Sequence, residues 1–209
     1  MAILIHYILS GIPVLLEGPT GTSKTRTTLI ACEYISKVLN KNKSGGSLLR
    51  FNLSAETKID DLLVKFTGDN NSASGLKIEE GQFFKAFTKG YKILLDEINL
   101  APREVLECIQ QALDSKILSV ECSGKILEKH KMNKNFGIIA TQNPNKGAFA
   151  NKRQELGIGF LSRFQKINFP NFTKEELIDI ANGLAKQNGC RKRHPFITII
   201  SHSSIKIVL

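Results

Sequence analysis

Gly18-Pro-Thr-Gly-Thr-Ser-Lys-Thr25 is the segment from which the architecture of this chain can be predicted. The apolar run Pro13-Val-Leu-Leu16 precedes it, and a helical pattern begins near Arg26. A strand, a tight glycine-containing turn and a helix N-terminus direct several backbone N–H groups and the positive end of a helix dipole at one point. The sequence therefore predicts a binding site for a polyphosphate.

Individual residues of this stretch match the phosphate-loop pattern of Gly, four residues, Gly, Lys and then Ser or Thr. Lys24 is expected to reach the β- and γ-phosphates, and the hydroxyl of Thr25 is expected to bind Mg²⁺. Ser23 stands where the pattern has its second glycine. If the backbone there needs a positive φ, serine costs on the order of 1–2 kcal/mol relative to glycine, and nucleotide affinity or turnover falls. The alternative is a Gly/Thr/Ser-rich turn without a ligand.

Length and composition indicate a globular α/β protein. The 209 residues are enough for one domain and a fragment of a second, and 42% hydrophobic with 23% charged residues excludes disordered and fibrous classes. Residues 1–16 are apolar but lack the basic start and cleavage site of a signal peptide, and we expect no membrane span. The cysteines at 32, 108, 122 and 190 have no Cys-x-x-Cys spacing, which favours reduced thiols in an intracellular protein over a metal site.

The formal charge of +10 is concentrated in part of the chain. Basic residues dominate from Lys125 to Lys166, and Arg191-Lys-Arg193 adds a short basic run. Such a surface can attract nucleic acid or an acidic partner. No aromatic residues alternate with the bases as a stacking platform requires, so a solvated face is favoured and nucleic acid is an unfavoured partner.

Strands and helices alternate along the chain, which predicts a parallel sheet with its site at the carboxyl ends of the strands. The predicted strands are 13–17, 48–51, 91–95, 136–141 and 166–170. Helices are predicted between these strands. The first has the apolar positions Leu29, Ile30, Val38 and Leu39, and another has Ile59, Leu62, Leu63 and Phe66 after a Thr57/Asp60 capping box. A third has Val105, Leu106, Ile109 and Leu113 after Pro102, and a fourth covers residues 154–163. Residues 68–75 are expected to be a mobile polar loop, and 116–129 a hairpin. A capping box at 173–176 predicts a helix that begins a second, helical subdomain.

Hydrolysis of ATP needs a metal-binding carboxylate, a group that orients the attacking water and a γ-phosphate sensor. Asp96 follows a buried strand and is expected to hold Mg²⁺ together with Thr25, while Glu97 polarises the water. Asn143 ends the adjacent strand and is expected to contact the γ-phosphate or the water. Arg163 is expected to reach the γ-phosphate of a neighbouring subunit. The alternatives are a structural ion pair for the Asp96-Glu97 strand end, an Asn-Pro turn for Asn143, and a surface arginine paired with a carboxylate for Arg163.

These stretches resemble the AAA+ ATPases, and more narrowly the dynein-related branch that includes midasin and the MoxR-type proteins. The matching motifs occur in family order over roughly residues 10–185: 16–25, Phe51-Asn-Leu-Ser-Ala-Glu-Thr57, Leu94-Leu-Asp-Glu-Ile-Asn-Leu-Ala-Pro102, Ala140-Thr-Gln-Asn-Pro144 and Phe160-Leu-Ser-Arg-Phe164. The resemblance implies a P-loop AAA+ core at 1–172, with a parallel sheet flanked by helices, and a truncated helical lid at 173–209. A second-sensor arginine is not recognisable, since the residues around Arg191 and Arg193 do not resemble the family's motif.

The resemblance also implies roles for residues. Lys24 and Thr25 take Walker A roles, Asp96 and Glu97 take Walker B roles, Asn143 is the first sensor and Arg163 the arginine finger. Asn52 takes the position that restrains the catalytic glutamate, and the 116–129 hairpin faces a ring's central channel. The predicted set is therefore catalytic Glu97, Asn143, Arg163 and Asn52; ATP-binding Gly18, Pro19, Thr20, Gly21, Thr22, Ser23, Lys24, Thr25 and Arg26; and Mg²⁺-binding Thr25 and Asp96.

The function that we expect is ATP binding and hydrolysis by an AAA+ module, coupled to remodelling of a protein or ribonucleoprotein assembly. Sister modules or subunits in a ring are the expected partners. A midasin-like protein is expected in the nucleus, and otherwise in the cytoplasm. Two alternatives stay open: a nucleotide-binding structural module that does not hydrolyse, and a helicase-like nucleic-acid motor.

Overall fold

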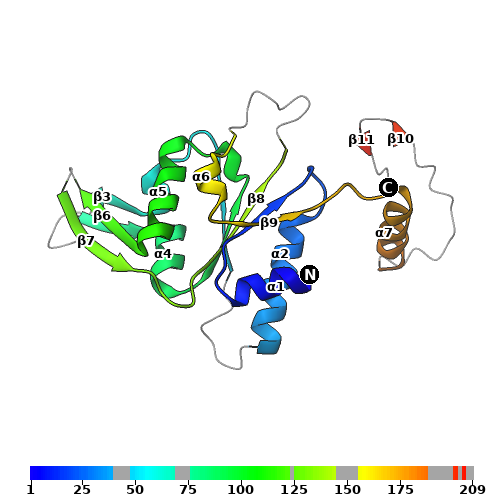
Figure 1. Ribbon diagram of the computed structural model, residues 1–209, viewed down its shortest axis with the longest axis horizontal. Helices are drawn as coiled ribbons and strands as arrows, with labels where there is room; N and C mark the ends of the chain where they lie inside the picture. Colours follow the sequence, from blue (N-terminus) through cyan, green and yellow to red (C-terminus); the bar gives the residue numbers. More distant parts are fainter. Residues whose placement is uncertain are drawn as a thin grey trace. The chain divides into compact units, whose positions relative to one another are not determined.

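A computed structural model describes residues 1–39, 48–68, 76–122, 125–144, 155–187, 200–201 and 204–205. The chain divides into two compact units, Met1–Asn171 and Phe172–Leu209. The central sheet and the helices around it belong to the first unit (Figure 1).

The first unit is built on a five-stranded parallel sheet with the strand order β2-β5-β8-β1-β9. Its strands are β1 (Val14–Glu17), β2 (Leu48–Asn52), β5 (Lys92–Asp96), β8 (Gly137–Gln142) and β9 (Gln165–Asn168). Each strand overlaps a run that the sequence predicts as a strand, so the predicted α/β class with a central parallel sheet is confirmed. Because the strands are parallel, their carboxyl ends share one edge of the sheet.

Helices cover both faces of this sheet, because alternate side chains of a strand point to opposite faces. Figure 1 shows α4 (Gln82–Lys89) and α5 (Arg103–Ser115) on one side, and α1 (Ala2–Leu9) and α2 (Lys24–Tyr34) on the other. Leu15, Ile93, Leu95, Ile138 and Ala140 pack into the larger core with α4 and α5. Val14, Leu16, Leu94 and Ile139 pack into the smaller core with α1 and α2.

Helix α2 buries a different face from the predicted one. Leu29 and Ile30 are 44% and 45% exposed, and Val38 in the π-helical turn Ile35–Leu39 is also exposed. The buried positions are Lys24, Thr28, Ala31, Cys32 and Ile35. These residues keep helical spacing, but most of them are small or polar, so a search for large apolar residues misses them. Ala31, Cys32 and Ile35 pack against the central sheet and α1, so Leu29 and Ile30 point outward.

The predicted helix with Ile59 and Phe66 is wrong in its second half. Helix α3 covers only Ile59–Leu62, and Val64–Gly68 forms strand β3, which pairs with the antiparallel strand β4 (Leu76–Glu80). Val64-Lys-Phe-Thr-Gly68 alternates apolar and polar residues up to Thr67, which is a strand pattern. The capping bond also differs from the predicted one, because the Asp61 carboxylate accepts from the Lys58 N–H at 2.9 Å. Residues 69–75 of the expected mobile loop lie outside the described residues.

The predicted hairpin is confirmed, because β6 (Ile117–Cys122) pairs with the antiparallel strand β7 (Lys125–Lys131). Residues 123–124 at its turn lie outside the described part of the chain. Helix α5 buries its four predicted apolar residues, Val105, Leu106, Ile109 and Leu113. Helix α6 spans only Ile158–Leu161 of the predicted 154–163, of which residue 154 is not described.

The second unit contains helix α7 (Lys174–Gln187) and two short antiparallel strands, β10 (Ile200–Ser201) and β11 (Ser204–Ile205). The predicted capping box is present at the start of the helix. The Thr173 N–H donates to the Glu176 carboxylate at 2.8 Å, and the Glu176 N–H donates to the Thr173 hydroxyl at 3.2 Å. Residues 188–199, which include the predicted stop at Gly189 and the basic run, lie outside the described residues.

Two cysteines have described side chains, Cys32 and Cys108, and both are free. Burial raises the pKa of each thiol to about 11. In the described ranges, His, Cys, Asp and Glu side chains form no cluster of three that could hold a metal ion. None of the helices described there has the length and apolarity needed to cross a membrane.

Candidate nucleotide-binding site

The loop between β1 and α2 has the backbone that a phosphate loop needs. Gly21 has φ 87°, and a Cβ on Gly18 would lie 2.2 Å from the carbonyl oxygen of Phe169, so a side chain there does not fit. Ser23 has φ 61° and ψ 23°. The backbone at Ser23 therefore has a positive φ, and serine there costs about 1–2 kcal/mol relative to glycine.

Lys24 begins α2 and is 7% exposed. Its ammonium donates to the carbonyl oxygens of Gly18 at 2.7 Å and Pro19 at 2.8 Å, and to Asn143 Oδ1 at 2.8 Å. The first two acceptors belong to the loop itself, and the third ends the neighbouring strand β8. The ammonium is thus held where the loop and the strand ends meet.

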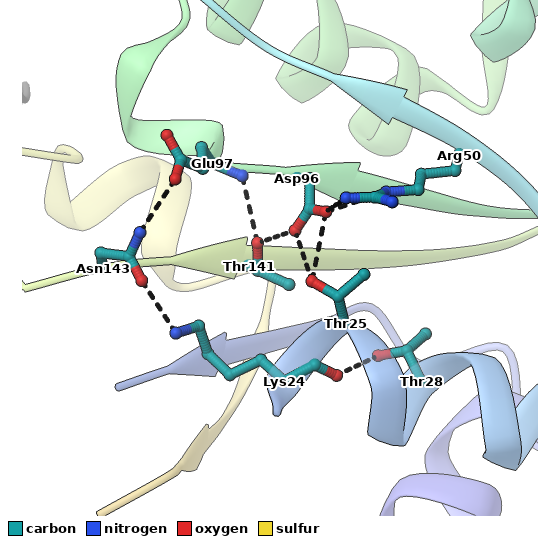
Figure 2. A network of polar contacts seen from close by, with 8 residues as sticks. All are labelled: Lys24, Thr25, Thr28, Arg50, Asp96, Glu97, Thr141 and Asn143. Atoms are coloured by element: carbon teal, nitrogen blue, oxygen red, sulfur yellow. Dashed lines mark hydrogen bonds and ion pairs between the residues drawn. The ribbon is translucent and has the colours of Figure 1, made fainter. Parts of the chain in front are cut away.

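Asp96 ends β5 and accepts hydrogen bonds from three other elements (Figure 2). Thr25 Oγ1, on α2, lies 3.1 and 3.2 Å from its two carboxylate oxygens. Thr141, on β8, donates to Oδ1 at 2.5 Å. Arg50, on β2, donates to Oδ2 from Nε at 3.0 Å and from Nη2 at 2.6 Å. The carboxylate is therefore buried but well supplied with donors, as a buried charge requires.

Glu97 follows the strand in a left-handed conformation with φ 55°. Its N–H donates to Thr141 Oγ1 at 3.1 Å, and its carboxylate accepts from Asn143 Nδ2 at 3.1 Å. Asn143 thus joins Lys24 on one side to Glu97 on the other (Figure 2). Asn99, in the 3₁₀ turn Ile98–Leu100, donates to the Asn143 carbonyl at 2.9 Å and holds this strand end in place.

One cavity of about 500 Å³ opens beside these groups. It is lined by Thr20, Gly21, Ser23, Lys24, Thr25, Arg26, Arg50, Asn52, Leu53, Asp96, Glu97, Thr141 and Asn143. Predicted residues from the phosphate loop, from the Asp-Glu strand end and from two further strand ends therefore meet at one place. Gly18, Pro19 and Thr22 do not line the cavity but contribute hydrogen bonds within the loop. The carbonyls of Gly18 and Pro19 accept from Lys24, and the Thr22 hydroxyl donates to the Pro19 carbonyl at 2.8 Å.

Arg163 does not line this cavity, and unlike Gly18, Pro19 and Thr22 it does not belong to the phosphate loop either. It precedes β9 and forms a bidentate ion pair with Asp114 of α5. Nε lies 2.7 Å from Oδ1 and Nη2 lies 2.6 Å from Oδ2 of that carboxylate. The guanidinium lowers the pKa of the Asp114 carboxyl below its usual value. Within this chain, then, Arg163 has the contact of a surface arginine paired with a carboxylate.

Asn52 lines the cavity beside Glu97. Among the described residues, however, the side chain that donates to the Glu97 carboxylate is Asn143. Restraint of Glu97 by Asn52 stays a prediction.

Arg50, Thr141 and Asn99 belong to the site but are not among the residues that the sequence predicts for it. Arg50 precedes Asn52 by two residues and so lies on the same face of β2. Thr141 and Asn99 lie inside motifs that the sequence reasoning used, but only the pairing of strands shows which partners they reach.

The side chains present fit a magnesium-bound nucleotide. A hydroxyl and a carboxylate, the groups of Thr25 and Asp96, are the hard oxygen ligands that Mg²⁺ prefers. The loop backbone and the ammonium of Lys24 fit a polyphosphate.

The part of the chain from β1 to the residue before β9 matches a known family of domains. A family model described as the AAA domain of the dynein-related subfamily matches residues 13–164. This chain belongs to that subfamily of AAA domains. The match confirms the resemblance seen in the motifs, and it covers every element that contributes a side chain to the cavity.

Relatives of this AAA domain include two midasins. The midasin of Dictyostelium discoideum is 31% identical over 169 residues, which are 80% of this chain and 3% of that protein. The midasin of Giardia intestinalis is 29% identical over 181 residues, which are 86% of this chain and 3% of that protein. The chain therefore spans about 3% of the length of these curated relatives.

A solved structure supports the AAA fold independently. The crystal structure of a protein described as a candidate ATPase from Cytophaga hutchinsonii superposes with a TM-score of 0.60. It is 21% identical in sequence, and the match covers 90% of this chain and 50% of that one. At this identity the likeness concerns the fold alone.

Proposed function

We propose that this AAA domain binds ATP with Mg²⁺ and hydrolyses it. One observation carries the proposal: Lys24, Asp96 and Glu97 converge on a single cavity at the carboxyl edge of the sheet. A buried ammonium and a hydrogen-bonded carboxylate at one cavity are the charges that Mg²⁺ and a triphosphate need.

Each side chain takes a role from its contacts. The loop N–H groups and Lys24 bind the phosphates, and Lys24 exchanges its loop carbonyls for phosphate oxygens. The Thr25 hydroxyl and the Asp96 carboxylate, which lie within hydrogen-bond distance of each other, would hold Mg²⁺. The metal, when bound, neutralises charge on the phosphates. Glu97 accepts the proton of the attacking water, and Asn143 holds the Glu97 carboxylate in place.

The test measures binding and hydrolysis separately. Glu97→Gln is expected to lower the rate of phosphate release by about 10²–10⁴ while calorimetry shows unchanged Mg-ATP binding, because it removes the base and keeps the shape. Lys24→Ala is expected to weaken Mg-ATP binding at least about tenfold through loss of charged hydrogen bonds. Lys37→Ala, in an exposed pair with Glu33, is the control and should change neither quantity.

Nucleotide binding without hydrolysis is a second candidate function. The serine at position 23 motivates it, because the phosphate-loop pattern has glycine there and serine adopts the left-handed conformation at a cost. A wild-type chain that binds Mg-ATP and releases no phosphate above the Glu97→Gln background would establish this alternative. A wild-type chain that binds no nucleotide would refute both.

We further propose that the module works beside sister modules and uses ATP to remodel a protein or ribonucleoprotein assembly. The midasin relatives support this, because the chain matches only a small part of each. Arg163 then acts on the nucleotide of a neighbour. Arg163→Ala in the full-length protein should lower hydrolysis about 10³-fold without changing nucleotide affinity. Asp114→Ala, which frees Arg163 from its partner, should not lower it.

A further inference from the structure

Arg50 and Asp96 form a charge pair in which the two side chains differ in burial. The side chain of Arg50 is 49% exposed, whereas that of Asp96 is 9% exposed. Asp96 is fixed by Thr25 and Thr141 on neighbouring elements. Arg50 has a long flexible side chain on β2 and reaches across to the next strand (Figure 2).

The hydrogen bonds to Asp96 occupy both of its carboxylate oxygens, which are the atoms that would hold a bound metal. Oδ1 accepts from Thr141 and lies 3.1 Å from the Thr25 hydroxyl, and Oδ2 accepts both guanidinium donors of Arg50. The hydroxyl contact is compatible with Mg²⁺, because its oxygen can bind the metal while its hydrogen points to Asp96. The guanidinium is not compatible, because it fills Oδ2 and places a positive charge beside a divalent cation.

We propose that Arg50 is the counter-ion of Asp96 in the nucleotide-free protein and that Mg²⁺ displaces it when the nucleotide binds. The inference rests on the proposed function, and it makes Arg50 a positioning residue rather than a catalytic one. Arg50 holds Asp96 ready for the metal and also competes with the metal for it. The site thus exchanges one cation for another instead of leaving a buried carboxylate unpaired.

Three features of the sheet make this exchange feasible. In the register of β2 with β5, Arg50 lies opposite Leu94, and Asn52 lies opposite Asp96. Arg50 therefore starts two residues short of the carboxyl edge, and its side chain extends along the strand to reach Asp96. Because about half of this side chain is exposed, the guanidinium can leave into water at little cost. Lys24 does not replace it, because its ammonium is held on the loop and on Asn143.

The experiment compares wild type with Arg50→Met, which keeps the apolar stem and removes the charge. The Mg²⁺ concentration that half-saturates binding of a fluorescent ADP analogue is the main readout. It is expected to fall about tenfold in the variant, because a charge-assisted hydrogen bond no longer competes for Asp96. The nucleotide-free variant, in EDTA, is expected to unfold at lower urea than wild type, and Mg-ADP should remove this difference.

Matched variants separate the possible outcomes. Arg103→Met removes an arginine from an exposed pair with Glu107 on α5 and should leave the Mg²⁺ dependence unchanged. Arg50→Lys keeps a charge without the two-pronged contact and should lie between wild type and Arg50→Met; it also serves if Arg50→Met does not fold.

An unchanged or increased Mg²⁺ requirement in Arg50→Met would overturn the inference. A tenfold loss of ADP affinity in EDTA would also overturn it, because Arg50 would then bind phosphate directly. Failure of the wild type to bind the analogue at any Mg²⁺ concentration is a different result. It would refute the proposed function, and the inference with it.

Discussion

Each end of strand β5 carries a buried ionisable side chain, and the two side chains have different surroundings. At the carboxyl end, Asp96 accepts hydrogen bonds from Thr141 and Arg50 and contacts the Thr25 hydroxyl beside a cavity. At the amino end, the Lys92 ammonium donates to the Asn135 carbonyl at 2.8 Å and packs against Gly137. Burial lowers the pKa of Lys92 and raises that of the nearby Cys32.

The contrast shows that a buried ionisable group is not by itself a site. At the amino end of β5, burial pushes Lys92 and Cys32 towards their neutral forms, which is what a low-dielectric environment does to isolated groups. At the carboxyl end, side chains from β2, α2 and β8 surround one carboxylate with donors and a cation. The parallel arrangement explains the difference, because it gathers the strand ends and the phosphate loop at one edge of the sheet.

The largest expected effect comes from removing the charge of Asp96. Asp96→Asn should lower the free energy of unfolding by about 3 kcal/mol, because the new amide group faces the donors of Arg50 and Thr141. Urea denaturation in EDTA measures this loss. Glu107→Gln, in an exposed pair on α5, is the matched control and should leave the unfolding curve nearly unchanged. Equal curves for both variants would show that the contacts of the Asp96 carboxylate do not stabilise the carboxyl end of β5.

The next effect tests the amino end through pH. The Cys32 thiol has a folded pKa of about 11 against 9.0 as its ordinary value, so the unfolded chain loses its proton first as pH rises. The stability that this thiol contributes is present below about pH 9 and is lost towards pH 11. Between pH 8 and 10 the wild type should lose about 1 kcal/mol more than Cys32→Ala. Parallel pH profiles for the two proteins would contradict the burial of this thiol.

Lys92 at the same end is expected to show the opposite sign. Its folded pKa lies below the unfolded value, so the unfolded chain binds more protons and stability rises with pH up to about 10.4. Lys92→Met should raise the free energy of unfolding by about 1 kcal/mol at pH 7, because it removes an isolated buried charge. The gain should shrink as pH approaches 10. A variant less stable than wild type at pH 7 would mean that the bond to Asn135 outweighs the cost of burial.

Much of this fold follows from local pattern. The three buried strands, β1, β5 and β8, were predictable because each is a short apolar run between turn residues. The hairpin β3–β4 was not, because Leu62, Leu63 and Phe66 also fit helical spacing. Only the pairing of Val64 with Glu80 and of Gly68 with Leu76 decides between the two readings. Sequence spacing contains no information about such pairs.

The site divides in the same way. Lys24, Asp96 and Asn143 could be placed from sequence, since each directly follows or ends a predicted strand or loop. Arg50 and Thr141 could not, because their contacts with Asp96 depend on the register between neighbouring strands. Asn99 could not, because its contact depends on the 3₁₀ turn that places it against the Asn143 carbonyl. Motifs thus identify Lys24, Asp96 and Glu97, whereas the pairing of strands decides which side chains, Arg50 among them, contact these groups.

Three non-glycine residues have positive φ in the described part of the chain: Ser23 and Glu97 line the cavity, and Lys116 follows α5. The turns that lead into β1 and β5 use glycine for positive φ, at Gly11 and Gly90. The carboxyl edge instead places Ser23 and Glu97 in the left-handed region, alongside the glycine at 21. Strain of this kind persists where the surrounding contacts over-determine the backbone, as at functional sites.

Ser23→Gly is therefore the smallest effect that we expect, and it has a definite sign. Relief of the left-handed strain exceeds the added freedom of glycine in the unfolded chain, so the free energy of unfolding should rise by about 0.5 kcal/mol. Ser10→Gly, at φ −76°, is the matched control and should lower it by a similar small amount, since there is no strain to relieve. Urea curves of both variants, recorded in EDTA, give the comparison. A loss of stability in Ser23→Gly equal to that of the control would show that the serine conformation costs nothing, and that the carboxyl edge stores no strain at this loop.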